Sequence, residues 1–416
     1  MSKYVIKGGN RISGKIEAES AKNAVLPLLA ASILTNDQVI LEKCPKIKDV
    51  LSMINILNAL GVKTHFEEDN LVIDPSGTND YVIPYKLTKE LRSSVFMLGS
   101  IISRFKIASV SLPGGCDIGL RPINMHIDGL KRLGVKVIEL GGKILCDAKN
   151  IRSGEVYFDF PSVGATENLM LASVLTQGTT ILHNVAKEPE VVDLQNFLNL
   201  MGAKVSGAGT NKIIIEGVKS LHGITYKPMF DRIEAGTYLI AASITGGEIE
   251  ISNCKKEKIL SLIHKLCDNT CKIVVKNDII YLKSGNRRKC FNIETSPYPG
   301  FPTDLQAQMT ALATVSDGIS IIRENIFETR YKHVLELKKM CSDITVKDRI
   351  CIVSGVNRLV GAVVDAHDLR GGAALVLAGL NAEGVTKVNN ICHIERGYFD
   401  FDKKLRSLGA EIIKEN

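Results

Sequence analysis

The sequence predicts an α/β protein of two domains, each holding three copies of one helix-and-strand unit. A chain of 416 residues is too long for one ordinary hydrophobic core. Helix-like and strand-like patterns alternate along it, which is typical of α/β folds. The same elements return six times at a period of roughly 70 residues, longer than that of the usual solenoid repeats. Two domains of three units each fit this length.

The first element of each unit is a helix rich in small residues. Ala and Gly allow neighbouring elements to approach closely, so we expect these helices to be buried at the centre of each domain. The six copies cover residues 20–34, 92–105, 164–175, 232–244, 303–315 and 369–380.

The next element is a strand of alternating apolar residues, which ends in Asn in several units. Clear examples cover residues 179–184, 247–253, 319–325 and 385–390.

A second helix then ends in Leu-Gly or Met-Gly and leads into another alternating strand. The glycines of the clear copies are Gly61, Gly134, Gly202 and Gly409. The first three are 73 and 68 residues apart, and the 207 residues up to the last divide into three further units of 69. Weaker copies at 263–275 and 337–346 fill the gap.

Composition and charge narrow the function classes. Apolar residues make up 45% and charged residues 23%, a soluble globular balance. The net charge of +7 is compatible with anionic ligands, but it is not the concentrated basic surface of a nucleic-acid binder. Trp is absent and aromatic residues are only 5%, which disfavours stacking platforms for bases.

The ten cysteines are scattered, with no CxxC pair and no closely spaced His ligands. This pattern favours reduced thiols over disulfides or zinc. The start, MSKYVIKGGNRIS, has no signal-peptide pattern, and the most apolar early run, 24–34, is too short for a membrane span. We therefore expect a cytoplasmic protein without membrane insertion; its oligomeric state stays open.

Polar residues gather at the starts of the small-residue helices. A helix N-terminus offers free backbone N–H groups and a positive potential, so it is a ready anion site. Any one cation there could be merely solvated, but cations at several equivalent positions indicate a common anionic ligand. The residues concerned are Lys22, Asn23, Arg92, Gly164 to Thr166, Asp304 and Asp368 to Arg370.

Four cations occupy near-equivalent turns after the repeated strands: Lys48, Arg121, Arg330 and Arg396. Arginine suits bidentate recognition of phosphate and carboxylate. The pattern predicts a substrate with several anionic groups, but it does not name the reaction.

Alternative interpretations remain for single residues. Asp304 lies in Thr303-Asp-Leu-Gln306, which matches a helix capping box. His126, His333 and His393 follow the arginine turns and are at least as readily structural as ligand-orienting. Neither a Walker loop nor an HExxH motif is present.

Over essentially its whole length the sequence resembles the enolpyruvyl transferases, and among them the branch that acts on UDP-N-acetylglucosamine. The motifs that carry the resemblance are ESAKNAVLP at 19–27, LPGGCDIGLRP at 112–122, FPSVGATEN at 160–168, PYPGFPTDLQAQ at 297–308, NIFETRYKH at 325–333, DAHDLRGGAALVLAG at 365–379 and HIERGY at 393–398.

The resemblance implies two inside-out α/β barrel-like domains of three repeats each, joined by a double hinge. The first strand then belongs with the C-terminal half. The expected domains are 1–21 with 231–416, and the inserted 22–230.

The activity implied is transfer of the enolpyruvyl group of phosphoenolpyruvate to the 3-hydroxyl of UDP-N-acetylglucosamine, with release of phosphate. It implies addition and elimination through a tetrahedral intermediate, with no metal or organic cofactor. It also implies the first committed step of peptidoglycan synthesis, and hence roles in cell wall biogenesis, cell shape and cell division.

The resemblance also assigns roles to matching residues. Asp304 would be the general base, and Cys116 would protonate the methylene carbon and be the target of the epoxide antibiotic fosfomycin. The phosphate and carboxylate groups would be held by Lys22, Asn23, Arg92, Arg121, Arg330, Arg370 and Arg396, with Lys22 and Arg396 also catalytic. The UDP-sugar would be held by Asn23, Arg92, Arg121, Pro122, Ile123, Asn124, Met125, Ser162, Val163, Gly164, Asp304 and Ile326.

A few positions depart from common family residues. They are Asn124 and Met125 where Asp-Leu is frequent, Phe160 where some members carry Lys, and Thr329 where Asn is usual. They affect details of nucleotide contact rather than the reaction.

The sequence disfavours three rival interpretations. The related transferase that acts on shikimate-3-phosphate lacks the cysteine loop and the SVGATEN segment. A non-catalytic UDP-sugar-binding relative would have lost Lys22, Cys116, Asp304 or Arg396, and all are present. An RNA-processing relative of similar architecture is disfavoured by the missing basic run and aromatic platforms.

Overall fold

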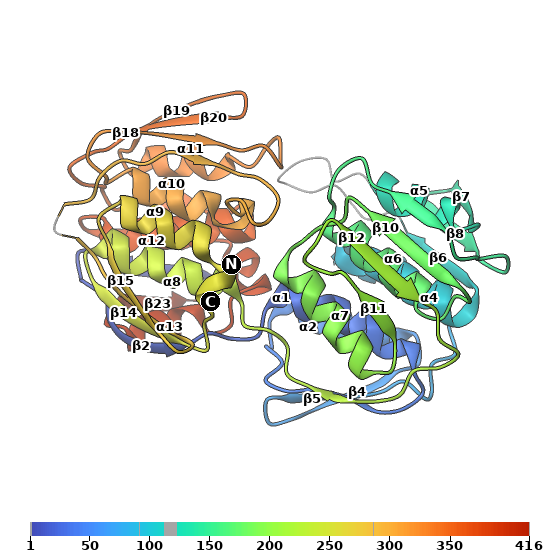
Figure 1. Cartoon of the computed structure of the whole chain (residues 1–416). Coiled ribbons are helices and arrows are strands. Elements are labelled where there is room, and N and C mark those ends of the chain that lie inside the picture. Colours follow the sequence, from blue (N-terminus) through green and yellow to red (C-terminus); the bar gives the residue numbers. More distant parts are fainter. Residues whose placement is uncertain (1, 91, 112–122, 286, 416) are drawn as a thin grey trace. The chain divides into compact units, whose positions relative to one another are not determined.

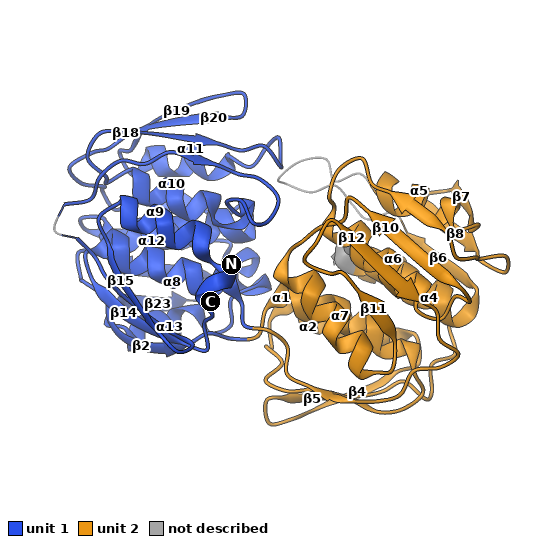
Figure 2. Cartoon of the chain, in the orientation of Figure 1, with its two compact units in different colours: residues 1–19, 116–120, 230–416 blue, residues 20–115, 121–229 orange. Residues whose placement is uncertain are grey.

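The chain forms two compact units in a computed structural model that describes residues 2–90, 92–111, 123–285 and 287–415. Of these residues, unit 1 contains 2–19 and 230–415, and unit 2 contains 20–111 and 123–229. Figure 2 shows them in blue and orange. Where the chain passes between the units, the two passing segments lie side by side. Asp231 N donates to Glu19 O at 2.7 Å, and Ala21 N donates to Met229 O at 2.8 Å.

Unit 2 has three central helices, three outer helices and three sheets (Figure 1). The central helices are α1 (Lys22–Ala31), α4 (Met97–Phe105) and α6 (Val163–Ser173). The outer helices are α2 (Lys48–Ala59), α5 (Asn124–Arg132) and α7 (Pro189–Leu200), and shorter turns are α3 (Tyr85–Glu90), η1 (Ser32–Leu34) and η2 (Arg92–Phe96). In the order of strand pairing, the sheets are β13 (Thr225–Tyr226), β3 (Val39–Leu41), β5 (Asn70–Asp74), β4 (Lys63–Glu67); β6 (Ile107–Ser111), β8 (Lys143–Asp147), β7 (Lys136–Leu140); and β11 (Lys204–Ser206), β12 (Lys212–Glu216), β10 (Thr179–His183), β9 (Glu155–Tyr157).

Unit 1 repeats this plan. Its central helices are α8 (Arg232–Thr245), α10 (Gln306–Ala313) and α12 (Leu369–Asn381). Its outer helices are α9 (Leu260–Asp268), α11 (Lys332–Lys339) and α13 (Phe401–Ser407), with short turns η3 (Lys256–Lys258), η4 (Thr303–Leu305) and η5 (Ile391–Arg396). The sheets are β15 (Lys272–Lys276), β16 (Ile279–Lys283), β14 (Glu248–Ser252), β2 (Ser13–Glu17); β17 (Ile293–Glu294), β18 (Ile319–Arg323), β20 (Ile350–Ser354), β19 (Asp343–Lys347); and β21 (Val363–Asp365), β22 (Val385–Asn389), β1 (Lys3–Lys7), β23 (Glu411–Glu415).

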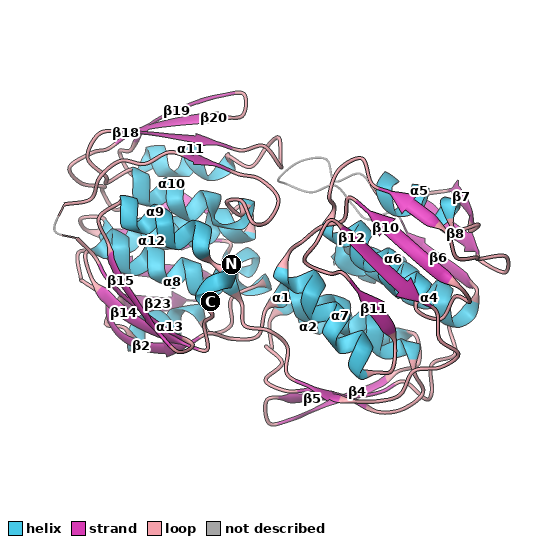
Figure 3. Ribbon diagram, viewed as in Figure 1, coloured by secondary structure: helices cyan, strands magenta, loops and turns pink. Residues whose placement is uncertain are grey.

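In each unit the central helices lie inside, and the sheets lie outside them (Figure 3). Every residue of α8 and of α10 is buried, as the small-residue pattern predicts. Close packing explains that composition: a Cβ on Gly99 of α4 would lie 2.2 Å from the carbonyl oxygen of Asn168 in α6. The predicted α/β class, with inside-out units built from repeats, is confirmed.

The N-terminal strands join sheets formed mainly by the C-terminal part of the chain. β1 pairs antiparallel with both β22 and β23, and β2 pairs parallel with β14. Unit 1 is therefore assembled from both ends of the chain.

The turn after each outer helix explains why two repeats were weak in the sequence. Gly61, Gly134, Gly202 and Gly409 all have φ between 86° and 99°. The equivalent residues of the weaker copies are Thr270, with φ 79°, and Cys341, with φ 64°. All six turns need a residue in the left-handed backbone conformation. Two of them use a residue with a side chain, which disfavours that conformation.

Candidate functional site

Unit 1 presents a carboxylate held between two buried guanidinium groups. Asp304 lies in η4, immediately before α10. Arg330 Nη2 donates to its Oδ1 at 2.7 Å, and Arg370 Nη2 donates to its Oδ2 at 3.2 Å. The Arg330 and Arg370 side chains are only 4% and 2% exposed, whereas that of Asp304 is 25% exposed. The carboxylate is thus reachable from solvent, while its two cations are fixed inside the unit.

Each guanidinium has buried nitrogen atoms that make no hydrogen bond among the described residues. Arg330 Nε and the Nε and Nη1 of Arg370 are buried and have no hydrogen-bond partner among the described residues. Because unpaired buried donors are costly, such groups indicate a site for an acceptor. Burial lowers the pKa of Arg370, but interactions with Tyr398 and Asp304 outweigh it and the net shift is upward. Two fixed, charged guanidinium groups suit a phosphate or carboxylate.

Tyr398 and Gln308 contact Arg370 and Asp304, respectively. The Arg370 Cζ lies 5.3 Å from the centre of the Tyr398 ring. Gln308 Nε2 donates to the Asp304 carbonyl at 3.1 Å and approaches the Tyr398 hydroxyl at 3.3 Å. Burial raises the pKa of Tyr398, so the phenol stays neutral.

The alternative interpretation of Thr303 to Gln306 as a capping box is wrong. Neither η4 nor α10 has a side-chain cap. The Thr303 hydroxyl instead lies 2.8 Å from Glu324 Oε2 and accepts from Arg330 Nη1 at 2.8 Å. The hydroxyl hydrogen goes to the Glu324 carboxylate, and the oxygen, which in a capping box would accept from a backbone N–H of the helix, accepts from Arg330 instead.

Ile326 and Arg396 also belong to unit 1. Ile326 follows β18, and its backbone N–H donates to Glu324 Oε1 at 2.9 Å. Arg396 ends η5 and is half-buried.

In unit 2, Lys22 begins α1, as predicted, and its ammonium is fixed by a carboxylate. Lys22 Nζ lies 3.0 Å from Asp49 Oδ2 of α2, with side-chain exposures of 13% and 4%. The N-cap residue of α1 is Ala21, which provides no side-chain cap. Asn23 is partly buried in the first turn, and Lys48 begins α2.

The SVGATEN segment forms the start of α6. Ser162 is its N-cap, with the hydroxyl accepting from Ala165 N at 3.3 Å. Val163 and Gly164 form the first turn and are partly exposed, so this helix end is accessible to an anion. A Cβ on Gly164 would lie 3.0 Å from Phe96 and 3.2 Å from the His126 ring.

Asn168 fixes the His126 ring behind this helix end. Asn168 Oδ1 accepts from Gly99 N at 2.6 Å, which leaves its amide nitrogen facing His126 Nδ1 at 2.9 Å. Nδ1 is therefore the acceptor, and the ring proton of the neutral form lies on Nε2. His333 is also buried, which lowers its pKa to about 4. These two histidines are structural parts of their helices.

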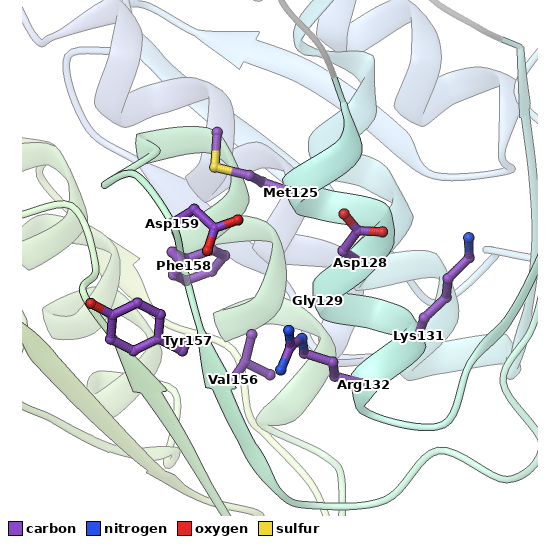
Figure 4. Close-up of a pocket in the computed structure, with 9 residues that line it drawn as sticks. All are labelled: Met125, Asp128, Gly129, Lys131, Arg132, Val156, Tyr157, Phe158 and Asp159. Atoms are coloured by element: carbon purple, nitrogen blue, oxygen red, sulfur yellow. The ribbon is translucent and has the colours of Figure 1, made fainter.

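A pocket of about 280 Å³ opens between α5 and β9 (Figure 4). Met125, one of the predicted nucleotide contacts, lines it together with the side chains that follow β9. Ile123 is the N-cap of α5 and Asn124 is exposed in its first turn. The remaining lining residues are Asp128, Gly129, Lys131, Arg132, Val156, Tyr157, Phe158 and Asp159.

Several predicted residues lie outside this description. Cys116, Arg121 and Pro122 are not among the described residues, and only the backbone of Arg92 is described, in η2. Nine other cysteines are free thiols. Burial raises the pKa of Cys44, Cys146, Cys254 and Cys351 to about 12.

The residues that sequence reasoning missed share one signal. Asn168 and Gln308 are polar residues inside otherwise apolar, small-residue helices, and Glu324 follows an alternating strand directly. Each is fully buried. A buried polar residue is almost always hydrogen-bonded, so a polar residue within an apolar pattern indicates a side chain held in one orientation by its partners.

The described residues meet neither the requirements of a membrane-spanning helix nor those of a metal site. None of their helices combines the length and apolar character that a membrane span needs. No three of their His, Cys, Asp or Glu side chains are arranged to hold a metal ion.

Comparison with known proteins gives concordant matches. A family model described as EPSP synthase (3-phosphoshikimate 1-carboxyvinyltransferase) matches residues 6–405. A UDP-N-acetylglucosamine 1-carboxyvinyltransferase 2 of Caldanaerobacter subterraneus is 48% identical over 100% of both chains. A UDP-N-acetylglucosamine 1-carboxyvinyltransferase 1 of Carboxydothermus hydrogenoformans is 46% identical over 100% of this chain and 99% of its own.

Solved structures share the fold. The enolpyruvyl transferase NikO from Streptomyces tendae superposes with a TM-score of 0.89 at 24% identity, covering 100% of this chain and 99% of that one. An EPSP synthase from Acinetobacter baumannii has a TM-score of 0.76 at 17% identity, covering 100% of both chains.

Proposed function

The chain belongs to the EPSP synthase family of enolpyruvyl transferases, and we propose that it transfers the enolpyruvyl group of phosphoenolpyruvate to the 3-hydroxyl of UDP-N-acetylglucosamine. The observation that carries this choice of acceptor is full-length identity of 48% and 46% to relatives named for UDP-N-acetylglucosamine. The reaction is a first step towards peptidoglycan.

The chemistry is an addition followed by an elimination. The 3-hydroxyl oxygen bonds to C2 of phosphoenolpyruvate, the hydroxyl proton leaves, and the methylene carbon gains a proton. The resulting tetrahedral intermediate then breaks its bond to the phosphate oxygen and loses a proton from the new methyl group. The products are an enolpyruvyl ether and inorganic phosphate.

Asp304 is the proposed base for the hydroxyl proton. Its partly exposed carboxylate accepts two charged hydrogen bonds, which fix its direction. The proposed acid for the methylene carbon is Cys116, by its match to the family motif.

Anion recognition is proposed for the cationic residues. Arg330 and Arg370 have buried N–H groups left over after binding Asp304, which supports contact with phosphate or carboxylate. Fixed donors of this kind stabilise charge that develops during a reaction without reorganising. We assign the same class of role to Lys22, Asn23, Arg92, Arg121 and Arg396 by their motifs.

The UDP-sugar is proposed to contact two further groups of residues. The accessible first turn of α6, at Ser162, Val163 and Gly164, offers backbone N–H groups to the diphosphate. Pro122 to Met125 and the Ile326 backbone complete the proposed contacts, with Met125 at the edge of the α5 pocket.

We place the enzyme in the cytoplasm. The nine described cysteines are all free, including four that are exposed, which is typical of a reducing compartment.

The test is phosphate release by the purified protein. Phosphoenolpyruvate with UDP-N-acetylglucosamine should give phosphate, and phosphoenolpyruvate alone or with shikimate-3-phosphate should not. Release that depends on shikimate-3-phosphate would overturn the proposal.

A further inference from the structure

The Arg330 guanidinium is held by a chain of buried polar groups that the proposed reaction does not itself use. Its two terminal nitrogens bind neighbouring residues of η4: Nη2 binds Asp304 and Nη1 binds the Thr303 hydroxyl at 2.8 Å. The same hydroxyl lies 2.8 Å from Glu324 Oε2. Glu324 is completely buried, and Arg330 is 4% exposed.

Counting hydrogens fixes the direction of this chain. A guanidinium can only donate, and an ionised carboxylate can only accept. The single hydrogen of Thr303 must therefore go to Glu324, and its oxygen must accept from Arg330. The buried positive charge is thus connected to a buried negative charge through one hydroxyl.

The other oxygen of Glu324 fixes the chain that follows β18. Oε1 accepts from the Thr295 hydroxyl at 2.9 Å and from the backbone N–H groups of Ile326 at 2.9 Å and Phe327 at 3.2 Å. The Phe327 ring in turn lies 5.2 Å from the Arg330 Cζ. One carboxylate therefore orients both the guanidinium and the backbone at the proposed sugar contact.

We propose that Thr303 and Glu324 are positioning residues, which hold Arg330 in the orientation that receives the anionic group of phosphoenolpyruvate. This inference rests on the proposed function. Without the hydroxyl, Nη1 loses its acceptor and the guanidinium can rotate away from Asp304. A buried charge with one lost partner reorients towards any acceptor in reach, so the preorganised geometry is lost.

Thr295 supplies a matched control. Thr303→Val and Thr295→Val each remove one hydroxyl that donates to the same carboxylate, at nearly the same distance. Only Thr303 contacts Arg330. The Thr295 hydroxyl instead accepts from the Asn325 backbone N–H at 2.9 Å. The melting temperature of each variant accounts for any unequal loss of stability, so a difference in kinetics between the folded variants reports on Arg330.

The experiment is steady-state phosphate release with phosphoenolpyruvate varied at saturating UDP-N-acetylglucosamine. We expect T303V to lower kcat/KM for phosphoenolpyruvate by about 10- to 100-fold, as loss of a supporting contact to a binding residue does. T295V should stay close to wild type, and Thr303→Ser, which keeps the hydroxyl, should restore most of the loss. Thr303→Ala repeats the comparison with a smaller side chain if T303V does not fold.

Two results would overturn the inference while leaving the proposed function intact: equal losses in T303V and T295V, or no restoration by T303S, with the wild type active in both cases. An inactive wild-type protein would instead count against the proposed function. A melting temperature of each variant separates loss of folding from loss of positioning.

Discussion

Asp304 links two neighbouring repeats of unit 1, because its two oxygens bind guanidinium groups from different repeats. Arg330 comes from the turn before α11 and Arg370 from the first turn of α12. A carboxylate between two cations is stable when ionised, and its partial exposure leaves it able to receive a proton.

Asp304→Asn is the sharpest single change at this position. The amide cannot take a proton, and it presents N–H groups to at least one guanidinium donor. We expect kcat to fall by about 10²- to 10⁴-fold, the range for loss of a general base. Phosphate release measures it, and a variant that keeps wild-type kcat would rule Asp304 out as the base.

Cys341 tests the energetics of the repeated turn. Its φ of 64° is left-handed, and its side chain is exposed. Left-handed φ costs a side-chain residue about 1–2 kcal/mol, and glycine costs about 0.5–1 kcal/mol in chain entropy. Cys341→Gly should therefore raise the free energy of unfolding by up to about 1.5 kcal/mol.

Denaturant unfolding of unit 1 measures that gain, with Cys341→Ala as the control. The alanine variant removes the thiol but keeps the Cβ, so it should not be stabilised. Equal stabilisation in both variants would assign the effect to the thiol instead of to the backbone.

At the scale of elements, helix α6 combines an accessible start with a buried carboxyl group in its second turn. Gly164 is packed against Phe96 and His126. Gly164→Ala would press a methyl group against both rings and displace the first turn. The KM for UDP-N-acetylglucosamine should rise about tenfold, the equivalent of 1.4 kcal/mol, with little change in the KM for phosphoenolpyruvate.

Gly154→Ala is the matched control in the same unit, because nothing lies within 4 Å of its added Cβ. Equal effects of the two alanines, or a change confined to phosphoenolpyruvate, would exclude the start of α6 from nucleotide binding.

Glu167 of α6 gives a prediction about pH. Both of its oxygens are buried without a hydrogen-bond partner among the described residues. Burial, reinforced by Glu190 and Glu188, raises its pKa well above the ordinary value. The folded protein therefore holds this proton more tightly than the unfolded chain.

The stability contributed by protonated Glu167 is complete below the unfolded pKa of about 4.3 and is lost as the pH rises towards the folded pKa. Glu167→Gln does not titrate. The free energy of unfolding of the variant, relative to that of the wild type, should therefore rise by up to about 1.4 kcal/mol per pH unit above pH 4.3. Thermal midpoints from pH 5 to 8 measure this, and a constant offset between the two proteins would contradict it.

For the whole molecule, the repeat could be predicted from the sequence because its turns and central helices need particular residues. Glycine marks four of the six turns, and small residues mark all six central helices. The other two turns carry Thr270 and Cys341 in place of glycine, so the sequence pattern is weak there. Tertiary packing holds these residues at a φ that their side chains disfavour, and local sequence preference cannot reveal this.

The site could be predicted only in part. Asp304, Arg330 and Arg370 were identified separately, by position and by motif, and the structure brings them together. The role of Thr303 was not predictable, because its hydroxyl oxygen could equally accept from a backbone N–H of the helix or from Arg330, while its hydrogen goes to a carboxylate 21 residues away in sequence. These partners depend on the tertiary fold, which places Glu324, the residue after β18, beside η4, and periodicity contains no such information.

The central claim is enolpyruvyl transfer to a UDP-sugar, and the product itself tests it most directly. The wild-type protein is incubated with phosphoenolpyruvate and UDP-N-acetylglucosamine in deuterated water, and the nucleotide sugar is analysed by mass spectrometry and NMR. We predict an enolpyruvyl ether at the 3-hydroxyl with deuterium in its methylene group, because that carbon gains a solvent proton before it loses one. Recovery of unmodified UDP-N-acetylglucosamine, or an ether without deuterium, would contradict the account.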